Sequence, residues 1–332
     1  MIWTRTPLRV TLGGGGTDLQ SYYQADGGFI FAMGLNKYIY TAVHRPALNH
    51  EVTLMGPEPE TVASADQLKH DLVREALIEH GLLDRFEAAS LADIAGGTGL
   101  GSSSCFLVGF LNGLHALAGR TPDRQALAEE ACRLEIEVLK RGIGKQDQYM
   151  AAFGGLTTLD IARNGAVTVG AVDITAETER AFVQHTHIYY TGRRRMAASI
   201  LADQNIAMLH EKGEDRSRTE DALSSIKDLG LEILAAWKAA DLEGWGRMLH
   251  RHWESKKKLS SKISWPLIDE LYDHARANLG VTGGKVIGAG GGGFLMLFTP
   301  GDGAELQAFM TSHDMPRLDY AIDRTGSTVT AP

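Results

Sequence analysis

The stretch IAGGTGLGSSSCFLVGFLNGLHALAG, residues 94–119, decides what kind of fold this chain adopts. Glycines lead into three serines, and apolar residues then recur at helical spacing, which predicts a glycine-rich loop that opens a buried helix. Backbone amides at the start of a helix have no partner within it and carry partial positive charge, so they bind anions such as phosphates. A tight strand-to-helix turn is the simpler alternative, but it leaves three small hydroxyl residues at the start of an apolar helix unexplained.

Composition narrows the class of protein. Of 332 residues, 38 are glycine, 9 are proline and 44% are hydrophobic, which excludes a collagen and a disordered chain. A length of 332 residues suggests two lobes or one large α/β unit. The 33 basic and 41 acidic residues give a net charge of −8, which does not favour nucleic acid or an anionic membrane as a partner.

The cysteine content and the hydropathy of the chain indicate in which cellular compartment the protein is expected. The two cysteines, Cys105 and Cys132, lie within apolar helix-like runs, and the opening MIWTRTPLRV has no basic and apolar leader. The sequence contains no apolar stretch of the ~18 residues needed to span a bilayer. These features predict a reduced, cytoplasmic protein.

Secondary-structure patterns alternate along the chain and predict a mixed α and β fold. Strands are expected at residues 8–12, twice within 29–43, within 156–190, and on both sides of the glycines in 285–300. Helices are expected at residues 70–83, 123–140 and through most of 217–278. The lysine-rich segment 253–262 is expected to be a solvated helix face.

A second glycine loop, GAGGGG at residues 288–293, formally contains the GxGxxG pattern of dinucleotide-binding sites. That fingerprint requires a helix to open at the loop, whereas the apolar run at 294–298 is strand-like. We expect these glycines to press against the loop at 96–104 or against its ligand. A plain hairpin connection and a dinucleotide-dependent oxidoreductase are the alternatives.

Charged residues lie beside three further glycine-rich segments, at residues 13–16, 142–144 and 154–155. Asp147, in RGIGKQDQYMAAFGG, could accept a proton from a substrate hydroxyl or orient it, and Lys145 is close enough to influence its charge. Arg9 lies on a predicted strand and Asp18 follows four glycines. Arginine suits the charge on a transferring phosphoryl group, and aspartate suits sugar hydroxyls. Taken singly, Asp147 also fits a helix cap, and Arg9 fits a surface strand.

With these segments in this order, the sequence resembles the GHMP small-molecule kinases, named for galactokinase, homoserine kinase, mevalonate kinase and phosphomevalonate kinase. Their first motif, PGRVNLIGEHTDY in galactokinases, corresponds to residues 7–19. The second, PxGxGLGSSxA, corresponds to GGTGLGSSSC at 96–105, and the third, KxxGAGxGG, to KVIGAGGGG at 285–293. Three motifs in the family's order make the resemblance specific.

The resemblance implies the two-lobed α+β fold of the GHMP kinases. An N-terminal lobe like ribosomal protein S5 domain 2 would take residues 1–185 and bind ATP, and a C-terminal lobe of split βαβ topology would take residues 186–332. The active site is expected between the lobes, with ATP and Mg²⁺ as cofactors. A homodimer is one possible assembly.

The same resemblance implies roles for single residues. Asp147 would act as the catalytic base, and Arg9 or Lys145 would stabilise the transferring phosphoryl group. Ser103 and Glu135 would hold the magnesium, with Ser104 and Glu137 as neighbours that could take those roles. The ATP phosphates would lie along Gly97, Thr98, Gly99, Leu100, Gly101, Ser102, Ser103 and Ser104. The sugar would contact Gly16, Thr17, Asp18, Gly290 and Gly291.

One departure from the galactokinase pattern concerns the substrate. Galactokinases have Glu-His where this chain has Gly15-Gly16, which argues against galactose. The combination GGGGTDLxSYY, GGF, NKYIY and GKQDQYMAAFGG resembles the D-glycero-α-D-manno-heptose 7-phosphate kinases, which phosphorylate the anomeric C1 hydroxyl to give the 1,7-bisphosphate. Arg193, Arg194 and Arg195 are candidates for the distal phosphate or form a solvated basic turn. A kinase of another sugar, such as fucose, arabinose or glucuronate, and a non-catalytic sugar sensor are the alternatives.

Overall fold

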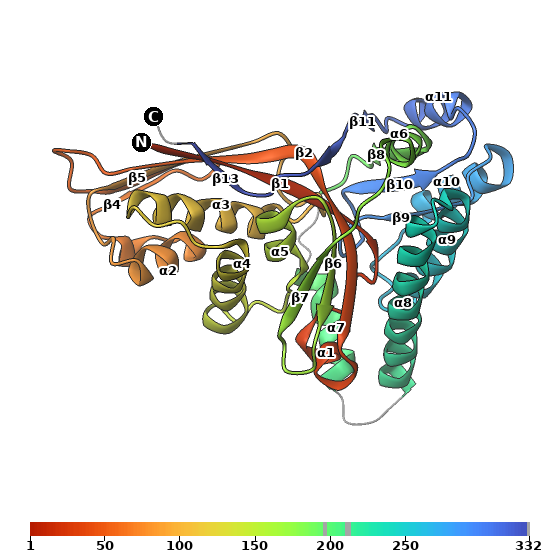
Figure 1. Ribbon diagram of the computed structural model, residues 1–332, viewed down its shortest axis with the longest axis horizontal. Helices are drawn as coiled ribbons and strands as arrows, with labels where there is room; N and C mark the ends of the chain where they lie inside the picture. The colour runs from red at the N-terminus through yellow and green to blue at the C-terminus, as the bar shows by residue number, and fades with distance from the viewer. Residues whose placement is uncertain (195–197, 210–213, 331–332) are drawn as a thin grey trace.

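The computed structural model describes residues 1–194, 198–209 and 214–330, which form two β-sheets with helices packed on them (Figure 1). Among these residues the larger sheet has nine strands. They are β1 (Ile2–Gly13), β2 (Gly28–His44), β3 (Val52–Met55), β4 (Glu60–Val62), β5 (Phe86–Ala92), β6 (Leu156–Ile161), β7 (Val167–Ala171), β12 (Ile322–Asp323) and β13 (Thr328–Thr330). Neighbouring strands are antiparallel except β3 and β5, which are parallel.

The long strand β2 organises this sheet. It pairs with β1 over most of its length, and its two ends pair with β5 and β6. The prediction of two strands within 29–43 is wrong, because one strand of 17 residues runs through the segment. At its middle, Gly34 and Leu35 pair with Asp323 and Ile322 of β12. β12 is distant in sequence, and its pairing with Gly34 keeps this glycine from ending the strand.

Helices cover one face of the large sheet (Figure 1). They are α2 (Asp71–Glu79), α3 (Ser102–Leu117), α4 (Arg124–Cys132) and α5 (Gln146–Phe153), while the short α1 (Gln20–Asp26) links β1 to β2. The central helix α3 packs directly on β1 and β2. Leu107, Leu111 and Leu114 on α3 are fully buried. The buried helix predicted after the glycine loop is therefore confirmed.

The second sheet has the order β11-β8-β10-β9 and is antiparallel. Its strands are β8 (Thr186–Tyr190), β9 (Gly283–Val286), β10 (Phe294–Phe298) and β11 (Arg317–Leu318). The helices of this part are α6 (Ala176–His185), α7 (Ala198–Leu209), α8 (Glu214–Lys238), α9 (Leu242–Lys257), α10 (Pro266–Asn278) and α11 (Ala304–Ser312). Trp237, Trp245 and Phe182 pack against one another in tilted and edge-to-face contacts where α8, α9 and α6 meet, which ties these helices into one core.

The chain does not divide at a single point. The second sheet begins at Thr186, but β12 and β13 return to the large sheet, where Thr330 pairs with Trp3. The division into residues 1–185 and 186–332 stays a prediction, and by strand pairing the large sheet also includes residues from the second range.

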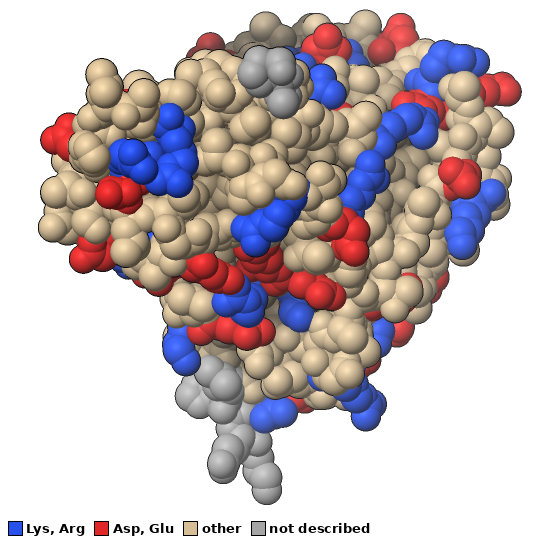
Figure 2. All heavy atoms as spheres, turned by 60° about the vertical axis from the view of Figure 1, so that its left-hand side comes forward, with Lys and Arg blue, Asp and Glu red and all other residues tan. Residues whose placement is uncertain are grey.

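The surface carries mixed charge. On the face shown in Figure 2, acidic and basic side chains are interspersed. The described residues contain no helix that combines the length and the apolar character needed to cross a membrane.

Two predictions about helices are wrong. The helix expected over 123–140 continues as an α-helix only to Cys132, and Arg133–Val138 form a π-helical turn. The segment 253–262 is not a uniformly solvated face, because α9 packs on β9 and the Lys256 side chain is buried. Both deviations bring charged side chains into the site described next.

Candidate active site

The loop before α3 presents backbone amides to a cleft of about 740 Å³ that residues of both sheets and their helices line. α3 begins at Ser102, its N-cap Gly101 has a φ of 79°, and no side chain caps the first turn. The amides of that turn are therefore open to an anion in the cleft. Gly97, Gly99, Gly101, Ser102, Ser103 and Ser104 line the cleft. Thr98 and Leu100, in the same loop, are buried and do not line the cleft.

The second glycine loop packs against the first. A Cβ added at Gly288 would lie 2.5 Å from the Gly99 carbonyl oxygen, so the two backbones approach as closely as glycine permits. The predicted contact between the two loops is confirmed. Residues 294–298 form strand β10 rather than a helix, which removes the dinucleotide fingerprint.

Arg9 and Asp147 form a bidentate ion pair at the floor of the cleft. The Arg9 Nε donates to Asp147 Oδ1 at 2.6 Å and Nη2 donates to Oδ2 at 2.8 Å. The remaining Nη1 donates to the Gly99 carbonyl at 2.6 Å. Arg9 comes from β1 and Asp147 from the first turn of α5, and both line the cleft. One guanidinium thus links the candidate base, Asp147, to the glycine loop at 96–104, which we call the phosphate loop.

Asp18 is a buried carboxylate beside this ion pair. Its Oδ2 accepts a hydrogen bond from the Gln146 amide at 3.0 Å. Any side chain at Gly144 would overlap the Asp18 carboxylate, so glycine is required there for the close approach. Burial raises the pKa of Asp18, and the nearby Asp147 charge raises it further. Asp18 lines the cleft within reach of a polar ligand.

Glu135 lies fully buried in the π-helical turn and faces the start of α3. It accepts hydrogen bonds from Ser104 Oγ at 2.5 Å and Gln148 Nε2 at 2.6 Å, and Ser103 Oγ lies 3.5 Å away. Burial raises the pKa of Glu135, while these donors and Arg141 oppose that rise. Short π segments often occur at functional sites, and here the turn brings a carboxylate to the phosphate loop.

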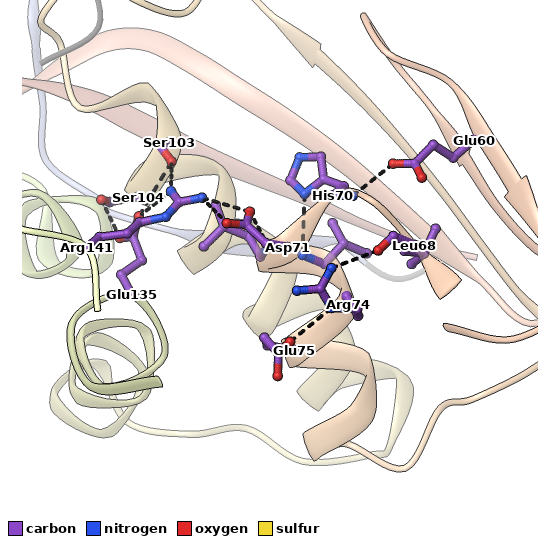
Figure 3. Close-up of polar contacts among 12 residues, drawn as sticks. Glu60, Leu68, His70, Asp71, Arg74, Glu75, Ser103, Ser104, Glu135 and Arg141 are labelled. Atoms are coloured by element: carbon purple, nitrogen blue, oxygen red, sulfur yellow. Dashed lines mark hydrogen bonds and ion pairs between the residues drawn. The ribbon is translucent and has the colours of Figure 1, made fainter. Parts of the chain in front are cut away.

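Arg141 is a site residue that the sequence reasoning missed. Its Nη1 donates to Ser103 Oγ at 3.0 Å and to Glu135 Oε1 at 3.3 Å. Its Nη2 donates to both carboxylate oxygens of Asp71 at 2.8 and 3.0 Å. Figure 3 shows the guanidinium lying between Glu135 and Asp71. An arginine that directly follows Lys140 and stands four residues before Lys145 gives no sequence signal of this bridge.

Two family models match the chain. The GHMP kinases N terminal domain matches residues 70–155, and the GHMP kinases C terminal domain matches residues 233–314. The chain belongs to the GHMP kinases. It is a phosphotransferase with an alcohol group as acceptor, and as a member of this family it uses ATP.

Known relatives of this GHMP kinase include two sugar kinases. The D-glycero-alpha-D-manno-heptose 7-phosphate kinase of Campylobacter jejuni is 27% identical over 316 residues, which are 90% of this chain and 89% of the relative. The L-fucokinase/L-fucose-1-P guanylyltransferase of Bacteroides fragilis is 26% identical over 332 residues, covering 90% of this chain but 34% of that protein.

Solved structures share the fold. A D-glycero-D-manno-heptose 1-phosphate kinase from Bacteroides thetaiotaomicron has a TM-score of 0.82 at 21% identity, covering 100% of this chain and 99% of that one. Lactococcus lactis galactokinase complexed with galactose has a TM-score of 0.73 at 17% identity, covering 99% and 95%. The predicted GHMP kinase fold is confirmed.

Several residues predicted for the site of this GHMP kinase lie outside the cleft wall. The Lys145 ammonium donates to the Gly165 carbonyl at 2.6 Å and lies over the Tyr23 ring. The Thr17 hydroxyl bonds the carbonyls of Gly14 and Phe29. Gly16 and Gly290 line the cleft, whereas Gly291, Glu137 and Lys145 do not.

The basic turn after β8 is also outside the cleft wall. The Arg193 guanidinium stacks over the Trp265 ring at 5.1 Å, and Arg194 is exposed. Neither lines the cleft, and Arg195 falls outside the described residues. In their place the GHMP kinase cleft is lined by two buried lysines, Lys256 and Lys285.

Proposed function

We propose that this GHMP kinase is an ATP-dependent sugar-1-kinase that phosphorylates the anomeric C1 hydroxyl of D-glycero-α-D-manno-heptose 7-phosphate. The observation that carries the proposal is the Arg9–Asp147 ion pair, which stands in one cleft with Asp18 and the open amides of α3. The full-length similarity to a heptose 7-phosphate kinase supports this choice of sugar.

In the proposed reaction, the ATP phosphates lie along Gly97–Ser104, where the first amides of α3 donate to their oxygens. Asp147 accepts a hydrogen bond from the C1 hydroxyl and orients that oxygen toward the terminal phosphorus. As the new C1–O–P bond forms, the bond from the terminal phosphorus to the β-phosphate oxygen breaks, ADP leaves, and Asp147 takes the hydroxyl proton. Since Arg9 already binds both carboxylate oxygens, Asp147 uses its remaining lone pairs for the hydroxyl. Positioning and electrostatics carry most of the rate enhancement in phosphoryl transfer.

The donor set beside α3 fits Mg²⁺, which prefers hydroxyl and carboxylate oxygens. Ser103 and Glu135 would hold the ion, which would neutralise phosphate charge when bound. Arg141 donates to Ser103 Oγ and Glu135 Oε1, so these two hydrogen bonds would have to be released for the two side chains to hold a cation. Asp71, bonded by Nη2, keeps Arg141 at the edge of the cleft.

Lys145 does not enter this proposal. Its ammonium is directed to the Gly165 carbonyl, so Arg9 is left to balance the charge on the transferring group. Asp18, buried and beside Asp147, would accept hydrogen bonds from sugar hydroxyls.

A kinase for an unphosphorylated sugar such as fucose is the second candidate, favoured by the similarity to a fucokinase-containing protein. The test is ATP turnover with heptose 7-phosphate, with the same heptose lacking the phosphate, and with L-fucose. Phosphorus NMR of the product shows whether the new phosphate is anomeric. Preference for L-fucose would overturn the proposed substrate, and absence of turnover with every sugar would favour the sugar sensor.

A further inference from the structure

Two lysines are buried in the wall of the cleft. Lys256, from the last turn of α9, is 7% exposed, and Lys285, on β9, is 2% exposed. Both line the cleft. The Lys256 ammonium donates to the Val286 carbonyl at 2.8 Å and to the Gly288 carbonyl at 2.5 Å. Among the residues that the structure describes, the Lys285 ammonium has no hydrogen-bond or ion-pair partner.

The surroundings of these lysines hold positive charge without a matching acid. The charged groups that act on Lys285 are Lys256 and Arg9, and Arg9 is already paired with Asp147. The His252 ring, 1% exposed, also lines the cleft, and neither of its nitrogens has a partner within the described part of the chain. Buried charges in proteins are normally paired, so this arrangement calls for an anion from outside.

The pKa values of both lysines are lowered by burial and by their cationic neighbours. Burial, followed by repulsion from Arg9, lowers the pKa of Lys256 to about 7. Burial, followed by repulsion from Lys256 and Arg9, holds the pKa of Lys285 well below its usual value. A bound anion would favour the charged form of both lysines.

The position of the pair connects it to the reaction centre. Lys256 bonds the Gly288 carbonyl, and Gly288 packs on Gly99. Gly99 in turn accepts from Arg9, which binds Asp147. The lysines therefore line the same cleft as the glycine loop at 96–104 and the candidate base, and both feel the charge of Arg9.

We infer that Lys256 and Lys285 form a phosphate subsite that binds a phosphate dianion in the cleft. The inference rests on the proposed function, since it supplies the cations that a phosphorylated sugar requires and that Arg193 and Arg194 do not bring to the cleft. Two sources share this chemistry: the phosphate that the acceptor sugar already carries, and the terminal phosphoryl group of ATP. The experiment distinguishes them.

The test is steady-state kinetics of Lys285→Met and Lys256→Met, which remove charge but keep length. If the subsite holds the acceptor's phosphate, KM for heptose 7-phosphate rises about 10- to 100-fold, while the constants for the unphosphorylated heptose and KM for ATP stay unchanged. If it holds the terminal phosphoryl group, kcat falls for both acceptors alike. Lys285→Arg, which retains the charge, restores part of either loss.

A binding measurement separates this inference from the proposed substrate. Calorimetric titration of the resting enzyme with inorganic phosphate needs no sugar, and we expect weaker binding by both methionine variants. Lys258→Met, an exposed lysine just after α9, is the matched control and retains wild-type binding. Thermal melts verify that the variants are folded. Unchanged phosphate binding together with unchanged kinetics would overturn the subsite, whereas weakened phosphate binding in an enzyme inactive on heptose 7-phosphate would overturn only the substrate.

Discussion

Two buried charge clusters of this kinase differ in whether their charges are balanced. In the first, Glu130 on α4 accepts from His115 Nε2 at 2.6 Å and from His80 Nε2 at 2.9 Å. In the second, Lys256 and Lys285 have no acidic partner among the described residues. The first cluster joins α2, α3 and α4 behind the sheet, whereas the second lines the cleft. We therefore expect the Glu130 cluster to stabilise the fold and the lysine pair, which lacks an acidic partner, to bind an anionic ligand.

The histidine cluster has the composition of a metal site, since its three ligand atoms lie within 4.8 Å of one another. Arg120 argues against that use. Its Nη2 lies 3.2 Å from His80 Nδ1, and because arginine can only donate, Nδ1 accepts. The proton of His80 is then on Nε2 and is donated to Glu130. Both nitrogens of His80 and both carboxylate oxygens of Glu130 thus have partners without a metal ion, whereas His115 Nδ1 has no partner among the described residues.

The largest expected effect concerns the Arg9–Asp147 ion pair, whose charges are balanced although it lies in the cleft. Asp147→Asn should lower kcat about 10²- to 10⁴-fold, because the amide orients the hydroxyl poorly and cannot take its proton. Binding of a non-hydrolysable ATP analogue should stay near the wild-type value. The exposed Glu137→Gln serves as the control. Near-native turnover of Asp147→Asn would disprove the catalytic role.

The balanced histidine cluster should show the opposite behaviour. Glu130→Ala leaves two half-buried imidazoles without their acceptor, so the free energy of unfolding should fall by about 2 kcal/mol, with kcat/KM unchanged. Denaturant titration and steady-state kinetics measure the two quantities. Glu129→Ala, an exposed neighbour on α4, should change neither. A loss of activity without a loss of stability would reverse the comparison.

The pH dependence of stability provides a finer test of the same cluster. Burial alone would raise the pKa of Glu130, but hydrogen bonds from His115 and His80 outweigh it and lower that pKa to about 2. A carboxylate whose folded pKa is lowered stabilises the protein above its unfolded pKa and loses that contribution as pH falls toward the folded pKa. The difference in unfolding free energy between wild type and Glu130→Gln should therefore be full near pH 6 and shrink below about pH 4.5. A difference that stays constant down to pH 3 would contradict this account.

The smallest expected effect has the opposite sign. Lys285→Met should raise the free energy of unfolding by about 1 kcal/mol at pH 7, because an unpaired buried ammonium is replaced by an apolar side chain. Since the pKa of Lys285 is lowered by burial, the gain should shrink as pH rises toward the usual lysine pKa. Thermal melts at pH 7 and pH 10 measure it. A clear destabilisation at pH 7 would mean that the lysine is structural.

Local pattern was enough to predict the glycine loop and the helix behind it, and the family resemblance pointed to Arg9 and Asp147, which both line the cleft. The glycines before Ser102 and the apolar spacing of α3 are local signals, and the family motifs placed Arg9 and Asp147 in one site. The ion pair between those two residues joins β1 to α5, and sequence spacing gave no distance for it.

Packing between segments distant in sequence determined the features that the sequence did not predict. Lys256 lies in a lysine-rich run that looks solvated, and only the docking of α9 on β9 buries it. Lys145 stands two residues from Asp147, yet its helix-start position directs it to Gly165 on a hairpin turn. The π-helical turn around Glu135 has no signal in the periodicity, which fits an ordinary helix across Cys132. These outcomes depend on partners distant in sequence.

β12 and β13, at the end of the chain, pair with strands of the large sheet, and this pairing affects the order in which the protein folds during synthesis. β13 covers the free edge of β1, with Thr330 opposite Trp3, and Asp323 of β12 pairs with Gly34 at the middle of β2. While a ribosome is still translating the second sheet, β1 presents an open edge and the middle of β2 lacks its partner strand β12. The lobe that carries the phosphate loop is translated first, yet its sheet is completed only after residues 322–330 leave the exit tunnel.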